Sequence, residues 1–353
     1  MSLWSAVADL PVEIEGYELQ GLFAAVSSDF ERKSTVIRLQ GGDDEGIGED
    51  VTYDAVDHEH LQAAGPELAL DGSWTLGSFS QHVGGLDTFP VAPQREVSRL
   101  YRRWAFESAA LDLALRQAGV SLYEHLGRVP RPVTFVVSLR LGEPPSLEPL
   151  RRRLAQHPDL HFKLDATSSW DDELIEALVQ TGAVDSIDLK GLYVGSIVDQ
   201  PPDADLYRRV ARAFPRAWIE DPLLTDETDA VLAHDRDRFA WDAPIHSIAD
   251  IESLTYPPRM VNIKPSRLGG LRSLLDAYDY CNRRAIGMYG GGQFELGPGR
   301  GQNQYLASLF HPDTPNDVAP SAYNLPEPPP GLPDSPLPVA AQAVGFRWGP
   351  TAG

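Results

Sequence analysis

The sequence predicts an α/β fold, a barrel of the TIM type built from repeated strand–helix units. Five short apolar stretches each end in a charged residue just before a loop: residues 161–165, 186–190, 218–222, 239–243 and 261–264. The spacing is 32 residues from Asp188 to Glu220 and 22 residues from Glu220 to Asp242. A further 22 residues lead to Lys264. Each interval has room for one loop, one amphipathic helix and one new strand, which is the βα repeat of a barrel.

Residues at the ends of such strands are expected to be functional. In a barrel the strand C-termini converge on one face, so residues there are expected to be catalytic rather than structural. Three carboxylates, Asp188, Glu220 and Asp242, would then meet at one point. Carboxylate oxygens are hard ligands, and three negative charges held together need a cation. We therefore predict a Mg²⁺ site, with Mn²⁺ as the alternative ion.

The composition of the chain indicates which partners and which cellular compartment to expect. At 353 residues, with 42% hydrophobic residues, the chain can form one large barrel or two to three smaller domains. The net charge of −21 would repel phosphate backbones and anionic membranes, so neither nucleic acid nor a membrane is an expected partner. The single Cys281 rules out an internal disulfide framework. Residues 1–20 lack the pattern of a secretory signal, so we predict a cytoplasmic location.

The segments before the barrel alternate between strand and helix patterns. Residues 11–53 alternate apolar and polar positions around a glycine- and acid-rich turn, which predicts a strand, a loop and a hairpin. Residues 96–127 carry a broad apolar helical face and stop at Gly127, which predicts helices. Asp112 and His125 are polar positions on these helices, and we expect both to be structural.

The remaining elements complete a barrel of eight strands. A strand is predicted at residues 133–138 and a helix at residues 147–156, ahead of the stretch that contains Lys163. After Lys264, the patterns predict a helix over residues 271–284, a seventh strand over 286–289 and an eighth over 317–322. Seven prolines between residues 325 and 338 predict extended chain that cannot pair as a central strand.

These strand ends resemble those of a known family. The chain has an acid after the third strand, Glu-x-Pro from Glu220, an acid after the fifth strand, and Lys-Pro-Ser-Arg-Leu-Gly-Gly from Lys264. This series resembles the enolase superfamily, in particular its muconate lactonizing enzyme and o-succinylbenzoate synthase-like branch (mandelate racemase/muconate lactonizing). The Gly-Ile-Gly-Glu stretch at residues 46–49 and the glycine-rich residues 290–297 resemble further segments of that family. The resemblance covers nearly the whole chain.

The resemblance implies an architecture and an activity. It implies a modified TIM barrel, (β/α)7β, at residues 129–322, an N-terminal α+β capping domain at residues 1–128, and a Pro-rich segment at residues 323–353 that returns to the capping domain. It also implies a metal-dependent isomerase or lyase that abstracts a proton α to a carboxylate through an enediolate: a racemase or epimerase, a cycloisomerase or a dehydratase. Loops of the capping domain, residues 23–33 and those after Glu49, would select a small carboxylate substrate. The sequence leaves the oligomeric state open, and a homo-oligomer is an option by analogy with the family.

The second strand departs from the family pattern. The family has Lys-x-Lys there, whereas this chain has Lys163-Leu-Asp165, and the missing second lysine usually serves as the base. Lys264 stands where the sixth-strand lysine belongs. Strand alternation puts Lys163 and Asp165 on the same face. Three hypotheses stay open: Asp165 is the base beside Lys163, Lys264 acts alone, or the ancestral activity is lost. The predicted catalytic residues are thus Lys264, Lys163 and Asp165.

Another departure is Lys190, two residues after Asp188, where the family commonly has Asn. Its amine would replace the absent lysine, pair with a carboxylate, or take over the electrostatic role of the metal ion. With Lys190, the predicted substrate-binding residues are Gln293 and Glu295 of the glycine-rich segment. The rival hypothesis is an enolase-like barrel that binds a small carboxylate or a partner without turnover.

Overall fold

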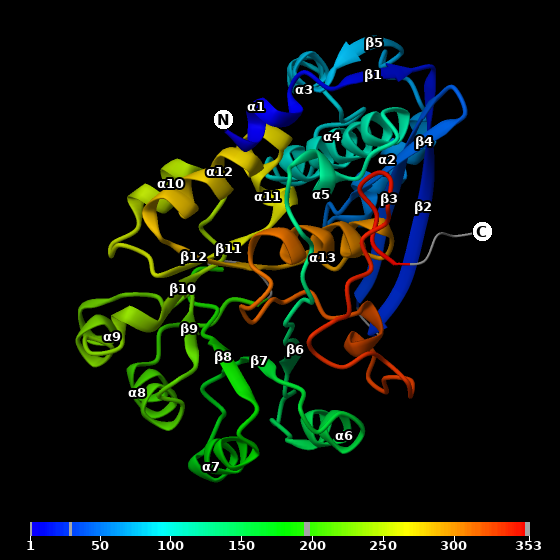
Figure 1. Cartoon of the computed structure of the whole chain (residues 1–353). Helices are drawn as coiled ribbons and strands as arrows, with labels where there is room; N and C mark the ends of the chain where they lie inside the picture. Colours follow the sequence, from blue (N-terminus) through cyan, green and yellow to red (C-terminus); the bar gives the residue numbers. More distant parts are fainter. Residues whose placement is uncertain (1, 28–29, 194–197, 350–353) are drawn as a thin grey trace.

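The computed structural model describes residues 2–27, 30–193 and 198–349 of the chain. Its central feature is a sheet of seven parallel strands in the order β12-β11-β10-β9-β8-β7-β6 (Figure 1). Strands that are consecutive in sequence are neighbours in the sheet, as repeated βα units require. The strands are β6 (Val137–Arg140), β7 (Phe162–Asp165), β8 (Val184–Asp188), β9 (Trp218–Glu220), β10 (Phe239–Trp241), β11 (Met260–Ile263) and β12 (Gly287–Gly290).

Helices follow the barrel strands and lie around them (Figure 1). Their apolar faces pack against a continuous core that includes the outward-facing residues of the strands. The predicted helix over residues 271–284 is confirmed at both ends. The helices are α6 (Glu148–Gln156), α7 (Asp172–Thr181), α8 (Ala204–Ala213), α9 (Asp226–Val231), α10 (Ile248–Ser253), α11 (Pro265–Leu268), α12 (Leu271–Arg284) and α13 (Pro298–Phe310), with a 3-10 turn η1 (Arg236–Arg238).

The barrel closes through a very short eighth position. Asn316 forms a parallel bridge with Phe135, and Asp317 forms one with Gly291. The strand predicted over residues 317–322 stops there, and the chain turns into the 3-10 helix η2 (Ser321–Asn324). Pro320 explains this difference because it has no N–H to donate to a neighbouring strand. The (β/α)7β barrel predicted from the sequence is confirmed.

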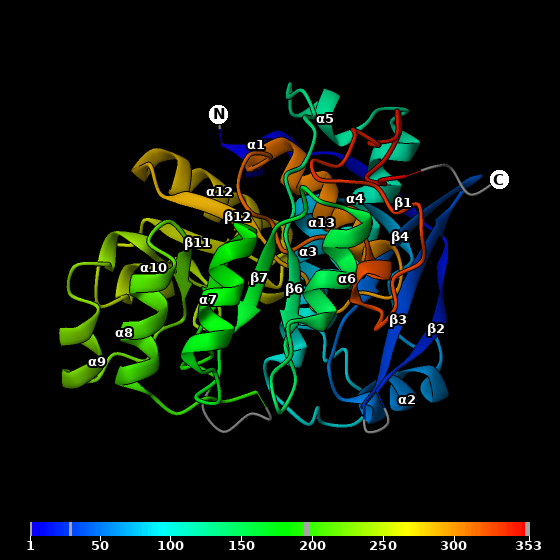
Figure 2. The same cartoon turned by 90° about the horizontal axis from the view of Figure 1, so that it is seen from below.

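An α+β unit formed by the N-terminal residues lies beside the barrel. The three-stranded antiparallel sheet β2-β3-β4 stands on the side away from α8 and α9 in both views (Figures 1 and 2). A second, two-stranded sheet pairs β1 with β5. The elements are α1 (Leu3–Val7), β1 (Pro11–Ile14), β2 (Gly16–Ser27), β3 (Phe30–Gly41), β4 (Asp44–Asp50), α2 (Ala55–Ala64), β5 (Gly72–Thr75), α3 (Leu76–Gly85), α4 (Ser98–Gln117) and α5 (Leu122–His125).

Strand β4 packs directly on the backbone of α4. A Cβ atom at Gly46 would lie 2.1 Å from the carbonyl oxygen of Ala109, and one at Gly48 would lie 2.1 Å from that of Ala105. Only glycine permits this approach. The Gly-x-Gly spacing therefore fixes where the capping sheet meets the long helix.

The C-terminal residues run back from the barrel to the N-terminal unit. Leu337 pairs with Val133 at the start of the barrel. The buried carboxylate of Asp112 on α4 accepts hydrogen bonds from the backbone N–H of Phe346 at 2.8 Å and from Nε of Arg347 at 2.7 Å. The structural role predicted for Asp112 is thus confirmed, whereas the predicted domain boundaries stay predictions. Within the described residues, no helix is both long and apolar enough to cross a membrane.

Candidate active site

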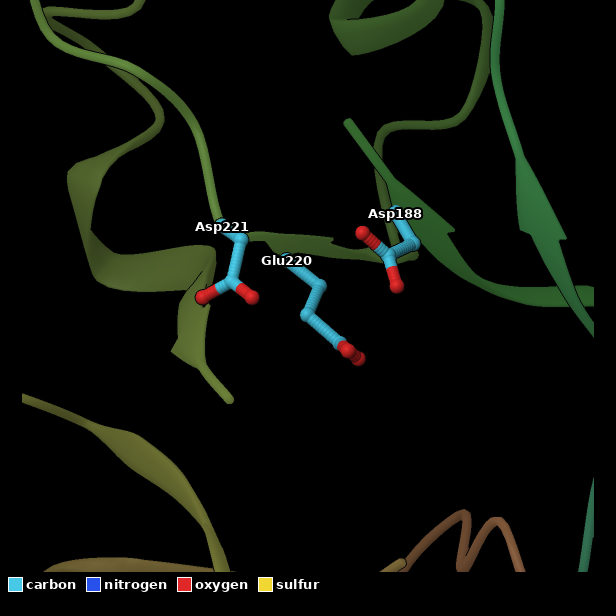
Figure 3. A group of neighbouring side chains, drawn as sticks. All are labelled: Asp188, Glu220 and Asp221. Atoms are coloured by element: carbon cyan, nitrogen blue, oxygen red, sulfur yellow. The ribbon is translucent and has the colours of Figure 1, made fainter. Parts of the chain in front are cut away.

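The acidic residues predicted from the strand ends are brought together at the barrel mouth. The parallel register sets Asp165 beside Asp188 and Asp188 beside Glu220. Figure 3 shows Asp188 at the end of β8, with Glu220 and Asp221 at the end of β9, their carboxylates side by side. One oxygen from each of these three residues lies within 4.8 Å of the others.

Lys163 joins two of these carboxylates from β7. Its buried Nζ lies 3.1 Å from Oδ2 of Asp188 and also contacts Oε1 of Glu220. Burial alone would lower the pKa of Lys163, but the charges of Glu220 and Asp188 outweigh it and hold the pKa well above its ordinary value. Lys163 therefore stays protonated and places a fixed positive charge between the two acids.

Glu220 remains incompletely paired. Burial, together with the neighbouring charges of Asp188 and Asp242, outweighs Lys163 and raises its pKa well above the ordinary value. Among the described residues, its buried Oε2 has no hydrogen-bond partner. A buried carboxylate oxygen without a partner carries a substantial desolvation cost, which a bound cation would offset.

Asp242, at the end of β10, is held by two cations. Nζ of Lys264 lies 2.7 Å from its Oδ2, and Nη1 of Arg267 lies 2.8 Å from its Oδ1. The hydroxyl of Tyr193 also donates to Oδ2 at 2.8 Å. Burial would raise the pKa of Asp242, but Arg267 and Lys264 hold it well below its ordinary value. Asp242 is therefore an ionised anchor for Lys264.

Lys264 follows β11 and is almost fully buried. Burial and the neighbouring guanidinium of Arg267 outweigh Asp242 and lower the pKa of Lys264. An amine whose pKa is lowered is more often neutral near pH 7, which is the state that accepts a proton. The sequence singled out Lys264 but not Arg267, whose part depends on a turn of helix α11 that folds it back over Asp242.

Asp221 is a site residue to which the sequence prediction assigned no metal-binding role. Its φ of 49° lies in the left-handed region, so the chain turns immediately after Glu220. Its carboxylate accepts hydrogen bonds at 2.8 Å from the backbone N–H groups of Asp242 and Ala243. Burial and the charges of Asp242 and Asp188 raise its pKa to about 7. Asp221 thus ties β9 to β10 and supplies a third oxygen near Asp188 and Glu220.

Asp165 and Lys190 face each other across β7 and β8. Nζ of Lys190 lies 3.4 Å from Oδ1 of Asp165 and 2.5 Å from Oδ2 of Asp188. Burial would lower the pKa of Lys190, but Asp188 and Asp165 hold it well above its ordinary value. A left-handed φ of 52° turns Lys190 back toward the mouth. The positive charge missing from the second strand is therefore supplied from the third.

Gln293 and Glu295 lie in the segment between β12 and α13. Oε1 of Gln293 accepts a hydrogen bond from Ser266 at 2.6 Å, whereas its buried Nε2 has no partner among the described residues. Glu295 is engaged by α13: its carboxylate lies 3.0 Å from Nη2 of Arg300 and accepts from Asn303 at 3.0 Å. Gln293 offers a free donor, while Glu295 mainly fixes the segment. The predicted roles of both in substrate binding stay predictions.

The donor set fits a divalent cation such as Mg²⁺. Three carboxylates, from Asp188, Glu220 and Asp221, provide close oxygen atoms, and Asp242 lies on the next strand. Hard oxygen ligands of this kind suit Mg²⁺ or Mn²⁺, and the unpartnered Oε2 of Glu220 is available to one. The ammonium groups of Lys163 and Lys190 contact the same acids and would compete with the ion.

Comparisons with known proteins agree with this geometry. Two family models match the chain: the C-terminal domain of the family described as domain of unknown function DUF8230 matches residues 129–325, and the N-terminal domain of the same family matches residues 5–125. Relatives include the N-succinylamino acid racemase of Thermus thermophilus, 28% identical over 306 residues that cover 82% of this chain and 78% of the racemase. The o-succinylbenzoate synthase of Bacillus subtilis is 27% identical over 234 residues, which cover 61% of this chain and 58% of the synthase.

Solved structures show the same fold. The dipeptide epimerase from Enterococcus faecalis has a TM-score of 0.69 at 15% identity, and the match covers 96% of this chain and all of that one. Muconate lactonizing enzyme from Pseudomonas putida has a TM-score of 0.59 at 19% identity, covering 87% of this chain and 88% of that enzyme. At these identities the likeness concerns the fold alone.

Proposed function

This chain belongs to the DUF8230 family and to the mandelate racemase/muconate lactonizing branch of the enolase superfamily, and from that premise we propose that it abstracts a proton α to a substrate carboxylate. The reaction would be that of an isomerase or a lyase, that is, a racemisation or epimerisation, a cycloisomerisation or a dehydration. Relatives named as racemase and synthase support this range without selecting within it.

The observation that carries the proposal is the location of the lysines, most of which lie at the barrel mouth. The sequence contains four lysines, at positions 33, 163, 190 and 264, against 26 arginines. Three of the four, Lys163, Lys190 and Lys264, have their ammonium groups on the carboxylates of the barrel mouth. Arginine is always charged and cannot act as a base at neutral pH, whereas a buried lysine can. The site therefore holds basic side chains that, unlike arginine, are able to exchange a proton.

Lys264 is the proposed base. Its pKa is lowered by burial and by Arg267, whereas those of Lys163 and Lys190 are raised by their carboxylate partners. Lys264 is thus the lysine of the site most readily deprotonated near neutral pH. Removal of the α proton leaves an enediolate, whose negative charge the protonated Lys163 would help to stabilise.

Asp165 remains the alternative base. Burial and the neighbouring Asp188 outweigh Lys190 and raise its pKa, which strengthens it as a proton acceptor. Its contact with Lys190 opposes that role, because an ammonium group 3.4 Å away lowers the pKa of the carboxylate and so makes it a weaker base. A reaction that needs proton transfer on both faces of the α carbon would need Asp165 as well as Lys264.

Asp188, Glu220 and Asp242 are the proposed ligands of Mg²⁺, or of Mn²⁺ in its place. Asp221 is the alternative to Asp242 as third ligand, because one of its oxygens lies within 4.8 Å of oxygens of Asp188 and Glu220, whereas Asp242 is paired with Lys264 and Arg267. When bound, the ion supplies Lewis-acid polarisation of the substrate carboxylate. Lys190 and Gln293 would bind the substrate by donating hydrogen bonds to its carboxylate, and Glu295 would hold the segment that carries Gln293.

The test is exchange of the α proton in D₂O. Acid sugars, dipeptides and N-acyl amino acids are incubated with the protein and Mg²⁺, and deuterium at the α carbon is followed by NMR. Exchange with any of these compounds, lost in Lys264→Met, supports the proposal. Arg272→Met is the matched control, since Arg272 is an exposed cation of the helix that follows. Full exchange in Lys264→Met would exclude Lys264 as the base, and Asp165→Asn then tests the alternative.

The rival function is binding of a small carboxylate or of a partner without turnover. The altered second strand favours it, because the usual base there is absent. No exchange across the library, together with a rise in melting temperature with one of its compounds, would support the rival. The predicted homo-oligomer and cytoplasmic location stay predictions.

A further inference from the structure

Arg32, on strand β3, joins the capping unit to the barrel mouth. Its side chain is fully buried. From the barrel it takes two acceptors: Nε donates to the carbonyl of Phe294 at 3.1 Å, and Nη2 donates to that of Gln293 at 3.0 Å. From its own unit it takes the carbonyls of Thr52 at 2.5 Å and Val51 at 2.7 Å. One guanidinium group thus connects two segments more than 200 residues apart in sequence.

These contacts require the shape of a guanidinium group. All four acceptors are neutral backbone carbonyls, so Arg32 is not placed there simply to neutralise a carboxylate. Its planar fork presents several donors in fixed directions, whereas a lysine has three donors at a single point. The guanidinium also lies 5.0 Å from the centre of the Tyr53 ring. Lysine at this position would keep the charge but could not reach both segments in this way.

Residues 293 and 294, whose carbonyl groups accept hydrogen bonds from Arg32, include a strained residue and contact the helix that follows Lys264. Phe294 has a φ of 60°, a left-handed conformation that is unfavourable for a bulky residue. Gln293, its neighbour, accepts a hydrogen bond from Ser266, which lies two residues after Lys264. The same Gln293 carries the buried Nε2 that has no partner among the described residues.

We infer that Arg32 is a positioning residue: it holds residues 290–297 in the shape that directs Nε2 of Gln293 toward the substrate. Arg32 stands on β3 of the capping unit, so its hydrogen bonds join that unit to the segment that carries Gln293. The nature of the ligand rests on the proposed function, but the grip itself does not. Arg32 touches backbone carbonyls rather than the reacting atoms, which is why it positions and does not catalyse.

The grip is tested by hydrogen–deuterium exchange of the whole protein. The backbone amides of Leu296 and Gly297 donate to Glu49 at 2.7 Å and 3.0 Å, so their exchange reports on the segment. In Arg32→Lys their exchange should quicken by about tenfold or more, because two hydrogen bonds from a charged donor are lost. Arg38→Lys is the control: Arg38 is on the same strand but pairs with Glu45 and Gln20, away from the barrel. Unchanged exchange in Arg32→Lys would overturn the inference.

A second variant separates the grip from a general loss of folding. Glycine adopts a φ of 60° without strain, so the double variant Arg32→Lys, Phe294→Gly should regain part of the lost protection. If the amides of β11 also exchange faster in Arg32→Lys, that variant unfolds globally. The double variant then decides whether Arg32 positions residues 290–297. Protection regained in residues 290–297 supports the grip, and protection that is not regained counts against it.

Kinetics with a compound that shows α-proton exchange complete the test. Arg32→Lys should raise KM about tenfold and change kcat much less, because Gln293 would contact ground state and transition state alike. A merely structural role would lower kcat with the folded fraction and leave KM unchanged. If no compound is exchanged, the proposed function fails, and the amide exchange still decides the role of Arg32.

Discussion

Replacing Lys190 by asparagine would restore the residue type that the family commonly has and would expose the electrostatics of the site. The ammonium group lies 2.5 Å from Asp188 and 3.4 Å from Asp165, and its side chain is largely buried. Without it, Asp165 loses the ammonium group that pairs with it, and among the residues that the structure describes Asp188 keeps Lys163 as its ion-pair partner. Removing one partner of a buried ion pair typically costs about 3–5 kcal/mol, because the remaining charge stays buried. We expect Lys190→Asn to lose that much unfolding free energy in EDTA.

Magnesium should restore much of this loss. A ligand that binds only the folded state at 100 times its Kd adds about 2.7 kcal/mol of stability. In Lys190→Asn, Asp188 is free of one competing ammonium group, so Mg²⁺ should bind more tightly than in the wild type and raise the stability of the variant more. Urea unfolding with EDTA and with Mg²⁺ gives the free energies, and titration calorimetry gives the affinities.

Two results would contradict this reasoning. If Lys190→Asn is as stable as the wild type in EDTA, the ammonium group does not compensate the acids. If Mg²⁺ and Mn²⁺ bind the variant but not the wild type, Lys190 takes the place of the metal ion, and the metal assignment is wrong for this chain. Arg208→Asn serves as the control: it removes an exposed i,i+3 partner of Asp205, should cost less than about 1 kcal/mol and should show no Mg²⁺ dependence.

Two further variants test the acids. Glu220→Gln should abolish the rise in melting temperature with Mg²⁺ and increase the stability of the metal-free protein, because burial and the charges of Asp188 and Asp242 disfavour the ionised carboxylate and raise its pKa. A rise in melting temperature with Mg²⁺ that persists in the variant, measured by calorimetry, would count against Glu220 as a ligand. Asp221, with a pKa raised to about 7, binds a proton in the folded state between about pH 4 and pH 7, where the unfolded chain has lost it. The free energy of unfolding in EDTA should therefore fall by about 1.4 kcal/mol for each unit by which the pH rises across that window. Asp221→Asn should reduce the slope measured by urea unfolding by this contribution, while Glu220, whose pKa is also raised, keeps its own. An unchanged slope would show that Asp221 does not contribute to it.

The sequence predicted the barrel because its signals repeat. The charged residues at the strand ends, together with the intervals between them, predicted β7 to β11. Because consecutive strands are neighbours in such a sheet, they also predicted that Asp188 lies beside Glu220. Helix α12 was predicted residue for residue, because its apolar face and its ends agree. The eighth strand was predicted too long, because pairing there depends on neighbours supplied by residues 135 and 291 rather than on its own pattern.

What the sequence could not reveal depends on backbone turns and backbone acceptors. Strand alternation would place Asp221 on the face opposite Glu220, but the strand has ended and a left-handed φ turns the residue back. Lys190 returns to the mouth by the same kind of turn, so its distance from Asp165 could not be read from spacing. The hydrogen bonds that Arg32 makes within the described residues go to backbone carbonyl groups, which every residue has. The sequence therefore contains no acidic partner that would have indicated its role.

The ion pairs at the barrel mouth bear on the chemistry. Four basic residues, Lys163, Lys190, Lys264 and Arg267, contact five carboxylates there, those of Asp165, Asp188, Glu220, Asp242 and Asp317. Compared with the pattern that the family commonly has, an aspartate replaces a lysine on the second strand and a lysine replaces an asparagine after the third. Together these differences lower the net charge by one and place the amine where Asp188 and Asp165 keep it protonated. A divalent ion would add two positive charges to this set. Asp221, protonated below about pH 7, can ionise to offset one of them, and a substrate carboxylate offsets the other. Of the three lysines there, Lys264 is the one whose pKa is lowered, which favours it as the amine that exchanges the proton in the proposed reaction.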